Sequence, residues 1–502
     1  MMRRTLSALA AVLISAPLAA ATTHPGPLGP GEWWYAQMGV DELHEHGTGQ
    51  GIVVAIIDTP LDPSVPELEG VEVLSSEGFC LLDGQPRPSR ETGPEAEHAT
   101  GMAVLIAGNG RGTGPGGAGV RGIAPDVQLR HYAVMYNEGE GQESMEGGGQ
   151  VCNLGGVDWA VSRSAPAAII EAARDGADII NLSLSTGANV GYTEAILTAH
   201  EHNAILVTGT AGDTYGWPAR SNGVLAVNPV RQDRGISEKA GGMARSHVRT
   251  DLAAPGEDIA GGGFPGGAWD SAMVSSGSSN STAIVSGGLA AIWSAHPSAT
   301  ANQIIQAAIT YTGVRPGDED GSWKHDFRRA PHAPTAAAKS QRHGYGIFAP
   351  ADAVLIDPTT LPDEMPLFRT DVDESPPIEE IREALARRAP DDSPAVRLGL
   401  VAGEEATATD PAQATSDSTE ATDRTATPDS TGTSADAATD ADAEQDSGTV
   451  AQVLWLAGAA ALAGVLLLGV LARRRRQPAA VPRTTEAPTH DPAPHDQGGT
   501  PR

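Results

Sequence analysis

Three short segments, each with one polar residue among small or apolar neighbours, constrain this chain most strongly. The first is GIVVAIIDT, which contains Asp58; the second is EHATGMAVLIAG, with His98 near its start; the third is SGSSNSTAIVSGG, which contains Ser279. An acid, a base and a hydroxyl nucleophile are the parts of a serine triad, in which the acid orients the base and the base takes the proton of the nucleophile. The segments together predict a site where three distant parts of the chain meet.

Each segment alone also has a plain structural interpretation. Asp58 follows an apolar run that predicts a buried strand, and polar residues at strand ends also occur in ordinary turns. His98 precedes a small and apolar stretch that suits a buried helix, so it could be only a helix-entry residue. Ser279 lies in a Ser-rich stretch flanked by glycine, where a loop serine is the default. The ordered combination of the three favours the catalytic interpretation.

The remaining apolar pattern predicts an α/β domain. Apolar runs typical of buried strands occupy Ile52–Ile57, Asp178–Leu184, Ala204–Val207 and Val224–Val230. They alternate with helical stretches at Ala165–Arg174, Tyr192–His202 and Ala299–Tyr311. Such alternation predicts a parallel sheet covered by helices on both faces. In sheets of this kind a site gathers at the carboxyl ends of the strands, where we expect Asp58 to lie.

The segments between these residues complete a resemblance to the subtilisin-like (family S8) serine proteases. GADIINLSLS, residues 176–185, resembles the strand that such enzymes lay beside an extended substrate, and GIAPDVQL, GVLAVNPV and DLAAPGEDI resemble other landmarks of the family. The resemblance covers about Gly51 to Leu355 and is greatest to the mycosins, the membrane-anchored proteases associated with type VII secretion in actinobacteria. It implies the subtilisin-like three-layer fold, with a parallel twisted sheet covered by helices.

The resemblance assigns roles to individual residues. Ser279 would attack a peptide carbonyl, His98 would take its proton and later protonate the leaving amine, and Asp58 would orient the imidazole. A helix from Ser279 through Ala291 would supply a backbone N–H group and a partial positive charge where an oxyanion develops. The residues implied for substrate binding are Ser183, Leu184 and Ser185.

One residue stands where the family has its second oxyanion donor. In VTGTAGDT, Asp213 occupies the position of an asparagine. An ionised carboxylate repels an oxyanion, whereas a neutral one donates a hydrogen bond. Loss of this kind of donor costs ~10²–10³ in turnover in a subtilisin. The resemblance therefore leaves two outcomes open: an enzyme of reduced turnover, or one that is active like the members of the wider family that also carry aspartate here.

Four further residues differ from the family pattern beside the catalytic positions. Pro60, Ala99 and Ser185 each replace a glycine, and Ala283 replaces a proline. Proline and alanine fix backbone geometry where glycine leaves it free. These differences affect efficiency and specificity more than fold.

Charge is concentrated outside the predicted domain. The chain has 502 residues and a formal net charge of -30. A balance this acidic excludes a general nucleic-acid partner, because phosphate binding needs a basic footprint. Residues 363–449 carry 22 acidic residues and 6 arginines, a net charge of -16. From Glu404 onward the composition is almost wholly Ala, Thr, Ser, Asp, Glu and Pro, which predicts disorder.

Both ends of the chain carry membrane signals. Arg3 and Arg4, an apolar run over 6–18 and small residues over 19–21 are typical of a secretory signal peptide. Residues 450–472 give 23 uncharged, largely apolar residues, which as a helix would be about 35 Å long and would cross a bilayer. The alternative is a buried soluble helix. Four arginines, 473–476, follow at once and predict a cytoplasmic carboxyl terminus.

These features give the expected organisation of the chain. A signal peptide at 1–21 precedes an N-terminal extension at 22–50, in which the Trp33, Trp34 and Tyr35 cluster is expected to pack on the domain. The peptidase domain follows at 51–358, and 359–449 form a mostly disordered acidic linker with one short amphipathic helix at 376–388. A transmembrane helix at 450–472 and a cytoplasmic tail at 473–502 complete the chain.

The two cysteines, Cys80 and Cys152, invite pairing in an exported chain. A similarly placed bridge occurs in mycosins, and two unrelated thiols are the alternative. Neither cysteine accompanies a histidine motif that would suit a nucleophile.

Two functions from different classes fit these observations. The first is a serine endopeptidase anchored outside the cytoplasmic membrane that cleaves exported proteins, with a link to type VII secretion. The second is a catalytically weak or inactive subtilisin-like protein that serves as a structural or binding component of a secretion complex. No Asp- or Asn-rich ligand loop stands out, so we expect neither a metal nor another cofactor.

Overall fold

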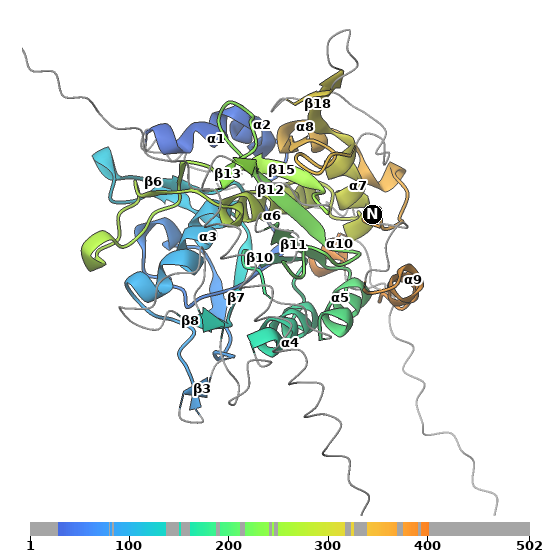
Figure 1. Ribbon diagram of the computed structural model, residues 1–502, viewed down its shortest axis with the longest axis horizontal. Coiled ribbons are helices and arrows are strands. Elements are labelled where there is room, and N and C mark those ends of the chain that lie inside the picture. The colour runs from blue at the N-terminus through green and yellow to red at the C-terminus, as the bar shows by residue number, and fades with distance from the viewer. Residues whose placement is uncertain are drawn as a thin grey trace, which may run out of the picture. The chain divides into compact units, whose positions relative to one another are not determined.

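A parallel sheet forms the centre of the structure, a computed structural model (Figure 1). The described residues are 29–400, apart from 80, 83–84, 137–149, 152–160, 187–190, 211–215, 240–242, 245–248, 317–322, 326–338, 369–374 and 390–392. All of them belong to one compact unit of the chain, Met1–Ala408.

The described part of the sheet has ten strands in the order β19-β18-β20-β15-β12-β11-β10-β1-β7-β2. Their bounds in chain order are β1 Val53–Asp58, β2 Val73–Ser75, β7 Gln128–Ala133, β10 Ile179–Leu182, β11 Ile205–Gly209, β12 Leu225–Val230, β15 Leu252–Pro255, β18 Thr312–Pro316, β19 Trp323–His325 and β20 Ile347–Phe348. From β2 across to β20 every neighbouring pair is parallel, and β18 runs antiparallel to β19 and β20.

Shorter elements surround this sheet. Among the described residues, five antiparallel pairs link β3 Leu81–Leu82 with β4 Gln85–Pro86, β5 Asn109–Arg111 with β6 Ala118–Arg121, β8 Met135–Tyr136 with β9 Gln150–Val151, β13 Glu238–Lys239 with β14 Met243–Ala244, and β16 Ile259–Ala260 with β17 Val274–Ser275. The α-helices are α1 Trp33–Gln37, α2 Val40–His44, α3 Glu97–Ala107, α4 Val161–Arg174, α5 Gly191–Glu201, α6 Ser278–Ala295, α7 Ala301–Thr310, α8 Pro350–Ala353, α9 Ile378–Ala386 and α10 Pro394–Arg397.

Side-chain alternation along the strands divides the core into two layers. Along β1, Val54 and Ile56 join the apolar cluster that contains α3, α6 and α7, whereas Ala55 and Ile57 join the cluster that contains α4 and α5. Successive strand residues point to opposite faces, so a strand buried on both faces must be apolar throughout. This explains the continuous apolar run in the sequence and confirms the predicted α/β fold with helices on both faces (Figure 1).

The predicted strands and helices are present within a few residues of their expected bounds. The site-bearing segments are placed by this arrangement: β1 ends at Asp58, α3 begins at Glu97, and α6 packs across β10, β11, β12 and β15. Because β7 lies on one side of β1 and the next strand of the sheet, β10, lies on the other, the order in which strands are added to the sheet changes direction at β1. Ligands bind at such switch points, outside the carboxyl ends of the strands.

The N-terminal extension packs on the domain, as the aromatic cluster predicted. Trp34 is fully buried in the larger apolar cluster. The indole of Trp33 donates a 3.1 Å hydrogen bond to the carbonyl of Glu257, and the guanidinium of Arg121 lies 3.7 Å from the centre of the Tyr35 ring. The same guanidinium forms a 2.9 Å ion pair with the buried Glu32. These contacts fix residues 30–44 on the surface of the domain.

Beyond the expected domain boundary at 358, residues 359–368 and the described residues up to 400 also pack on the domain. Met365 and Leu367 are buried in the main apolar cluster, and so is Ile381 on α9. Helix α9 lies within the predicted short helix and contacts α5. Both carboxylate oxygens of the buried Asp178 receive the guanidinium of Arg397 at 2.5 and 2.6 Å.

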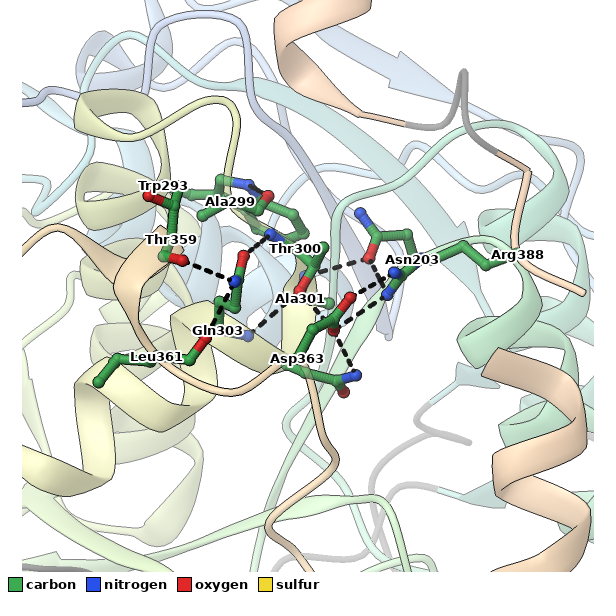
Figure 2. A network of polar contacts seen from close by, with 11 residues as sticks. Asn203, Trp293, Ala299, Thr300, Ala301, Gln303, Thr359, Leu361, Asp363 and Arg388 are labelled. Carbon is green, nitrogen blue, oxygen red and sulfur yellow. Dashed lines mark hydrogen bonds and ion pairs between the residues drawn. The ribbon is translucent and has the colours of Figure 1, made fainter. Parts of the chain in front are cut away.

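A polar network adds to this attachment (Figure 2). The carboxylate of Asp363 accepts hydrogen bonds from Thr300 at 2.7 Å and Asn302 at 2.9 Å, and it pairs with Arg388 at 2.6 Å. In the capping box that begins α7, Oε1 of Gln303 accepts the backbone N–H of Thr300, and the side-chain N–H of Gln303 donates to the carbonyl of Leu361 at 3.1 Å. Burial alone raises the pKa of Asp363, but the bonds from Arg388 and its other donors outweigh burial and lower it.

Several predicted features lie outside the described residues. They are the signal peptide at 1–21, the linker from 401 to 449, the membrane segment at 450–472, the tail at 473–502, Cys80, Cys152 and Asp213. Among the helices that the structure does describe, none has both the length and the apolar character needed to span a membrane.

Candidate active site

Asp58 ends β1 at the carboxyl edge of the sheet. Its side chain is fully buried. One carboxylate oxygen, Oδ1, accepts the backbone N–H of Thr59 at 2.7 Å and lies 2.6 Å from Nδ1 of His98. A carboxylate only accepts, so Nδ1 of His98 carries the proton and Nε2 is the basic nitrogen of the neutral ring.

His98 is held in place by the turn that follows β1. Its neighbour Ala99 donates its backbone N–H to Oγ1 of Thr59 at 3.1 Å. One residue further along α3, Oγ1 of Thr100 accepts the backbone N–H of Asp62 at 2.9 Å. The first turn of α3 is therefore tied at two points to the segment that leaves Asp58, which fixes the spacing between the acid and the base.

The electrostatic setting of His98 favours a charged ring. Burial lowers the pKa of His98, but the negative charge of Asp58 and its hydrogen bond outweigh burial, so the pKa is raised above 6.5. The side chain keeps 37% of its surface exposed, which leaves it open to a substrate. This is the behaviour needed of a general base that becomes an imidazolium during the reaction.

Ser279 is the second residue of α6. Its side chain is half-buried, and Oγ donates a 3.0 Å hydrogen bond to the backbone carbonyl of Ser183. In return, Oγ of Ser183 lies 3.1 Å from the carbonyl of Ser279 and 3.0 Å from Oδ1 of Asn181. Asn181 in turn donates to Ser286, two turns along α6, at 3.0 Å. Strand β10 and the start of α6 are thus locked together.

The structure places the nucleophile candidate near the substrate-strand candidate and the acid beside the base. Within the described residues, Ser279 and His98 share no hydrogen bond, because the hydroxyl of Ser279 points to Ser183. A serine side chain has three staggered positions about Cα–Cβ, so a rotation moves Oγ without moving the helix. Ser183 and Leu184 are buried, whereas Ser185 is exposed at the end of this segment.

Three of the four substitutions beside the site are buried, and the fourth, Ser185, is exposed. Ala99 and Ala283 are fully buried, and Pro60 is buried as well. The described residues contain no group of three or more His, Cys, Asp or Glu side chains placed to hold a metal ion.

Two residues that matter to the geometry were not singled out from the sequence. Thr59 binds both Asp58 and the backbone of Ala99. Asn181 is a polar residue inside an otherwise apolar strand, and this contrast is the signal by which it was recognisable. Thr59 has no comparable signal, since a threonine after a strand is common in turns.

Comparison with known proteins identifies relatives of this chain. The model of the Subtilase family matches residues 49–346. Subtilisin E of Bacillus subtilis is 27% identical over 293 residues, which are 55% of this chain and 66% of the relative. This chain therefore spans about two thirds of the length of that relative.

Two solved structures of MycP1 are also similar to this chain. One, from the ESX-1 type VII secretion system, is 20% identical with a TM-score of 0.49 over 67% of this chain and 89% of the other. The second, from Mycobacterium smegmatis, is 21% identical with a TM-score of 0.48 over 69% of this chain and 90% of the other.

Proposed function

Because this chain belongs to the subtilase family of serine proteases, we propose that it is a serine endopeptidase with Asp58, His98 and Ser279 as its catalytic residues. The observation that carries this proposal is the 2.6 Å hydrogen bond between Nδ1 of His98 and the buried carboxylate of Asp58. That bond sets the tautomer in which Nε2 is free to take a proton. Ser279 lies in the first turn of α6, a helix of 18 residues, as a nucleophile of this family should.

The proposed reaction follows from these positions. Ser279 rotates from Ser183 toward His98, gives its proton to Nε2 and attacks the peptide carbonyl. The imidazolium is stabilised by Asp58 and then protonates the leaving amine. The N–H groups at the start of α6 and its partial positive charge stabilise the oxyanion. Water then hydrolyses the acyl-enzyme by the same proton transfers in reverse.

A fluorophosphonate probe tests the nucleophile directly. The purified protein should become labelled at Ser279 over mildly acidic to mildly alkaline pH, and Ser279→Ala should remove the label. Ser281→Ala is the matched control, since Ser281 is fully buried on the same helix and its hydroxyl donates to the carbonyls of Ala254 and Pro255. Labelling that is absent, or that persists in Ser279→Ala, would refute the assignment.

The peptidase domain is proposed to act outside the cytoplasmic membrane on exported proteins. The support comes from the sequence: a predicted signal peptide at 1–21, an apolar segment at 450–472 and four arginines after it. In intact cells, added trypsin should remove the domain and leave the tail at 473–502 protected. A domain recovered in the soluble cytoplasmic fraction would contradict this topology.

The link to type VII secretion rests on the resemblance of the sequence to the mycosins. It implies that the protein associates with a type VII membrane complex and that its substrates are proteins exported by that system. Cross-linking in native membranes should recover components of such a complex. Exported proteins should remain uncut in a strain that carries Ser279→Ala.

A disulfide between Cys80 and Cys152 is part of the same proposal. The two residues are 72 positions apart, so a bridge would close a long loop and stabilise the fold by roughly 4 kcal/mol in the chain-entropy model. Peptide mapping without reduction should find one cross-linked pair. Two free thiols in the exported protein would exclude it.

The second candidate is a catalytically weak protein with a structural role in a secretion complex. The observation that favours it is the hydroxyl of Ser279, which is bound to Ser183 and not to His98. If this is the function, cells that carry Ser279→Ala should keep secretion intact while deletion of the whole chain abolishes it. Equal loss of secretion in both strains would favour the endopeptidase.

A further inference from the structure

A buried histidine lies on the strand next to the one that ends at the proposed catalytic acid, Asp58. His131 is on β7, and its Cα is the register partner of Ile56 on β1, two residues before Asp58. Its side chain is fully buried, in a strand whose neighbours on the sheet are mostly apolar. A polar ring in such a place needs a partner or a function.

The partner of His131 is the backbone just past Asp58. Nε2 of the imidazole lies 2.8 Å from the carbonyl oxygen of Thr59. Because a carbonyl only accepts, Nε2 carries the proton and donates. Burial lowers the pKa of His131 to about 4, although the Thr59 bond and the charge of Asp58 both act to raise it. The ring is therefore neutral over the range in which a serine protease works.

Thr59 is the residue through which this bond reaches the site. Its N–H donates to Asp58, its hydroxyl oxygen accepts the N–H of Ala99 beside His98, and its carbonyl accepts the N–H of His131. All three polar groups of Thr59 are thus fixed. A shift of its carbonyl would move the N–H that orients the carboxylate and the hydroxyl that holds the first turn of α3.

Packing alone does not account for a histidine here. The second ring nitrogen, Nδ1, is buried and has no hydrogen-bond partner. Leaving a polar atom unpaired in the core costs free energy that an apolar side chain of similar size would not. The cost is explained if the donor on Nε2 is needed at Thr59.

We propose that His131 is a positioning residue for the Asp58–His98 pair, acting through Thr59. This inference rests on the proposed function for its meaning in catalysis. It concerns a hydrogen bond that orders the acid and the base, and it does not require His131 to touch a substrate.

Substitution at 131 tests the role of the donor. His131→Leu removes the donor and puts an apolar side chain of similar volume in its place, whereas His131→Gln keeps an N–H at nearly the same distance from the backbone. His200→Leu is the matched control, because His200 is also a buried histidine whose pKa burial lowers to about 4, and it lies on α5 away from the site.

The first measurement is the titration of His98 by nitrogen NMR in the Ser279→Ala background, which needs no activity. His131→Leu should lower the pKa of His98 toward 6.5 and broaden the signal of its Nδ1 proton, and His131→Gln should preserve both. His200→Leu should leave both unchanged. An unchanged His98 titration in His131→Leu, or an equal change in His131→Gln, overturns the inference.

The second measurement is the rate of peptide cleavage with Ser279 present. His131→Leu should lower kcat by about 10- to 100-fold with little change in KM, since small misplacements of catalytic groups have costs of this order. His131→Gln should restore most of the loss, and similar losses in both variants would overturn the inference. Should His131→Leu fail to fold, His131→Met takes its place in both measurements. A wild-type protein without activity refutes the proposed function, and the NMR titration still decides the role of His131.

Discussion

The side chain of Ile381 offers the sharpest test of how far the folded domain extends. Ile381 lies in an acidic segment whose composition predicts a linker, yet its side chain is fully buried on α9. A β-carbon built on Gly223 would lie 3.1 Å from its Cδ1, so the helix packs directly against the body of the domain. If residues 359–400 are part of the fold, truncating this side chain must destabilise the whole domain.

The expected size of the effect follows from the burial. Ile381→Ala removes three buried carbons, each worth about 0.8 kcal/mol. A residual cavity adds to this transfer cost, which gives a total of about 2–4 kcal/mol. The free energy of unfolding from urea denaturation, followed by tryptophan fluorescence, should fall by this amount.

The matched control is Glu383→Ala on the same helix. Glu383 is exposed, and its replacement should change the free energy of unfolding by less than about 0.5 kcal/mol. The reasoning is refuted if Ile381→Ala behaves like this control. The same result would return the domain boundary to 358.

Three further outcomes follow from the site and its surroundings. Because Asp58 raises the pKa of His98, Asp58→Asn should move the rise of labelling rate with pH to lower pH and should reduce the maximum rate, and a rate profile unmoved by Asp58→Asn would contradict this prediction. In the wild type, the stability that the Asp58–His98 pair contributes is present below pH 6.5 and is lost as pH rises through the raised pKa of His98. Burial raises the pKa of Glu67, which accepts the indole N–H of Trp269 at 2.8 Å, so this carboxyl contributes stability below its unfolded pKa that is lost as pH rises through the folded value. Glu67→Gln should therefore flatten the dependence of Tm on pH, and an unchanged slope would count against it. Asp213→Asn should raise kcat if Asp213 is the weakened oxyanion donor, and an equal or lower kcat rules that role out.

Much of the fold was readable from the sequence because burial on both faces leaves a simple pattern. The continuous apolar runs that became β1, β10, β11 and β12 are found where predicted. Helix α9 was also recognisable from its spacing. Its attachment was not, because that depends on contacts between distant residues: Arg397 pairs with Asp178, which is 219 positions away.

The sequence likewise predicted one part of the candidate site and not the other. Asp58 and His98 were expected to meet, and they do. The hydroxyl of Ser279 was expected to serve the base, and here it binds Ser183. A side-chain rotation of this kind is set by neighbours in space, so the order of residues along the chain carries no information about it. His131 was missed for the same reason, since its importance depends on the carbonyl that β1 presents to β7.

The departures from the family pattern are distributed unequally around the site. On the acid and base side, Pro60 fixes a backbone angle that glycine would leave free, whereas the backbone N–H by which Ala99 bonds Thr59 is one that glycine would also supply. The turn after Asp58 is held further by the bond between the carbonyl of Thr59 and His131. The nucleophile side has no comparable bond from Ser279 to His98. The choice between an efficient enzyme and a weak one therefore depends on how readily Ser279 leaves Ser183 and on what Asp213 does to the oxyanion, and variants at these positions discriminate better than further changes near Asp58.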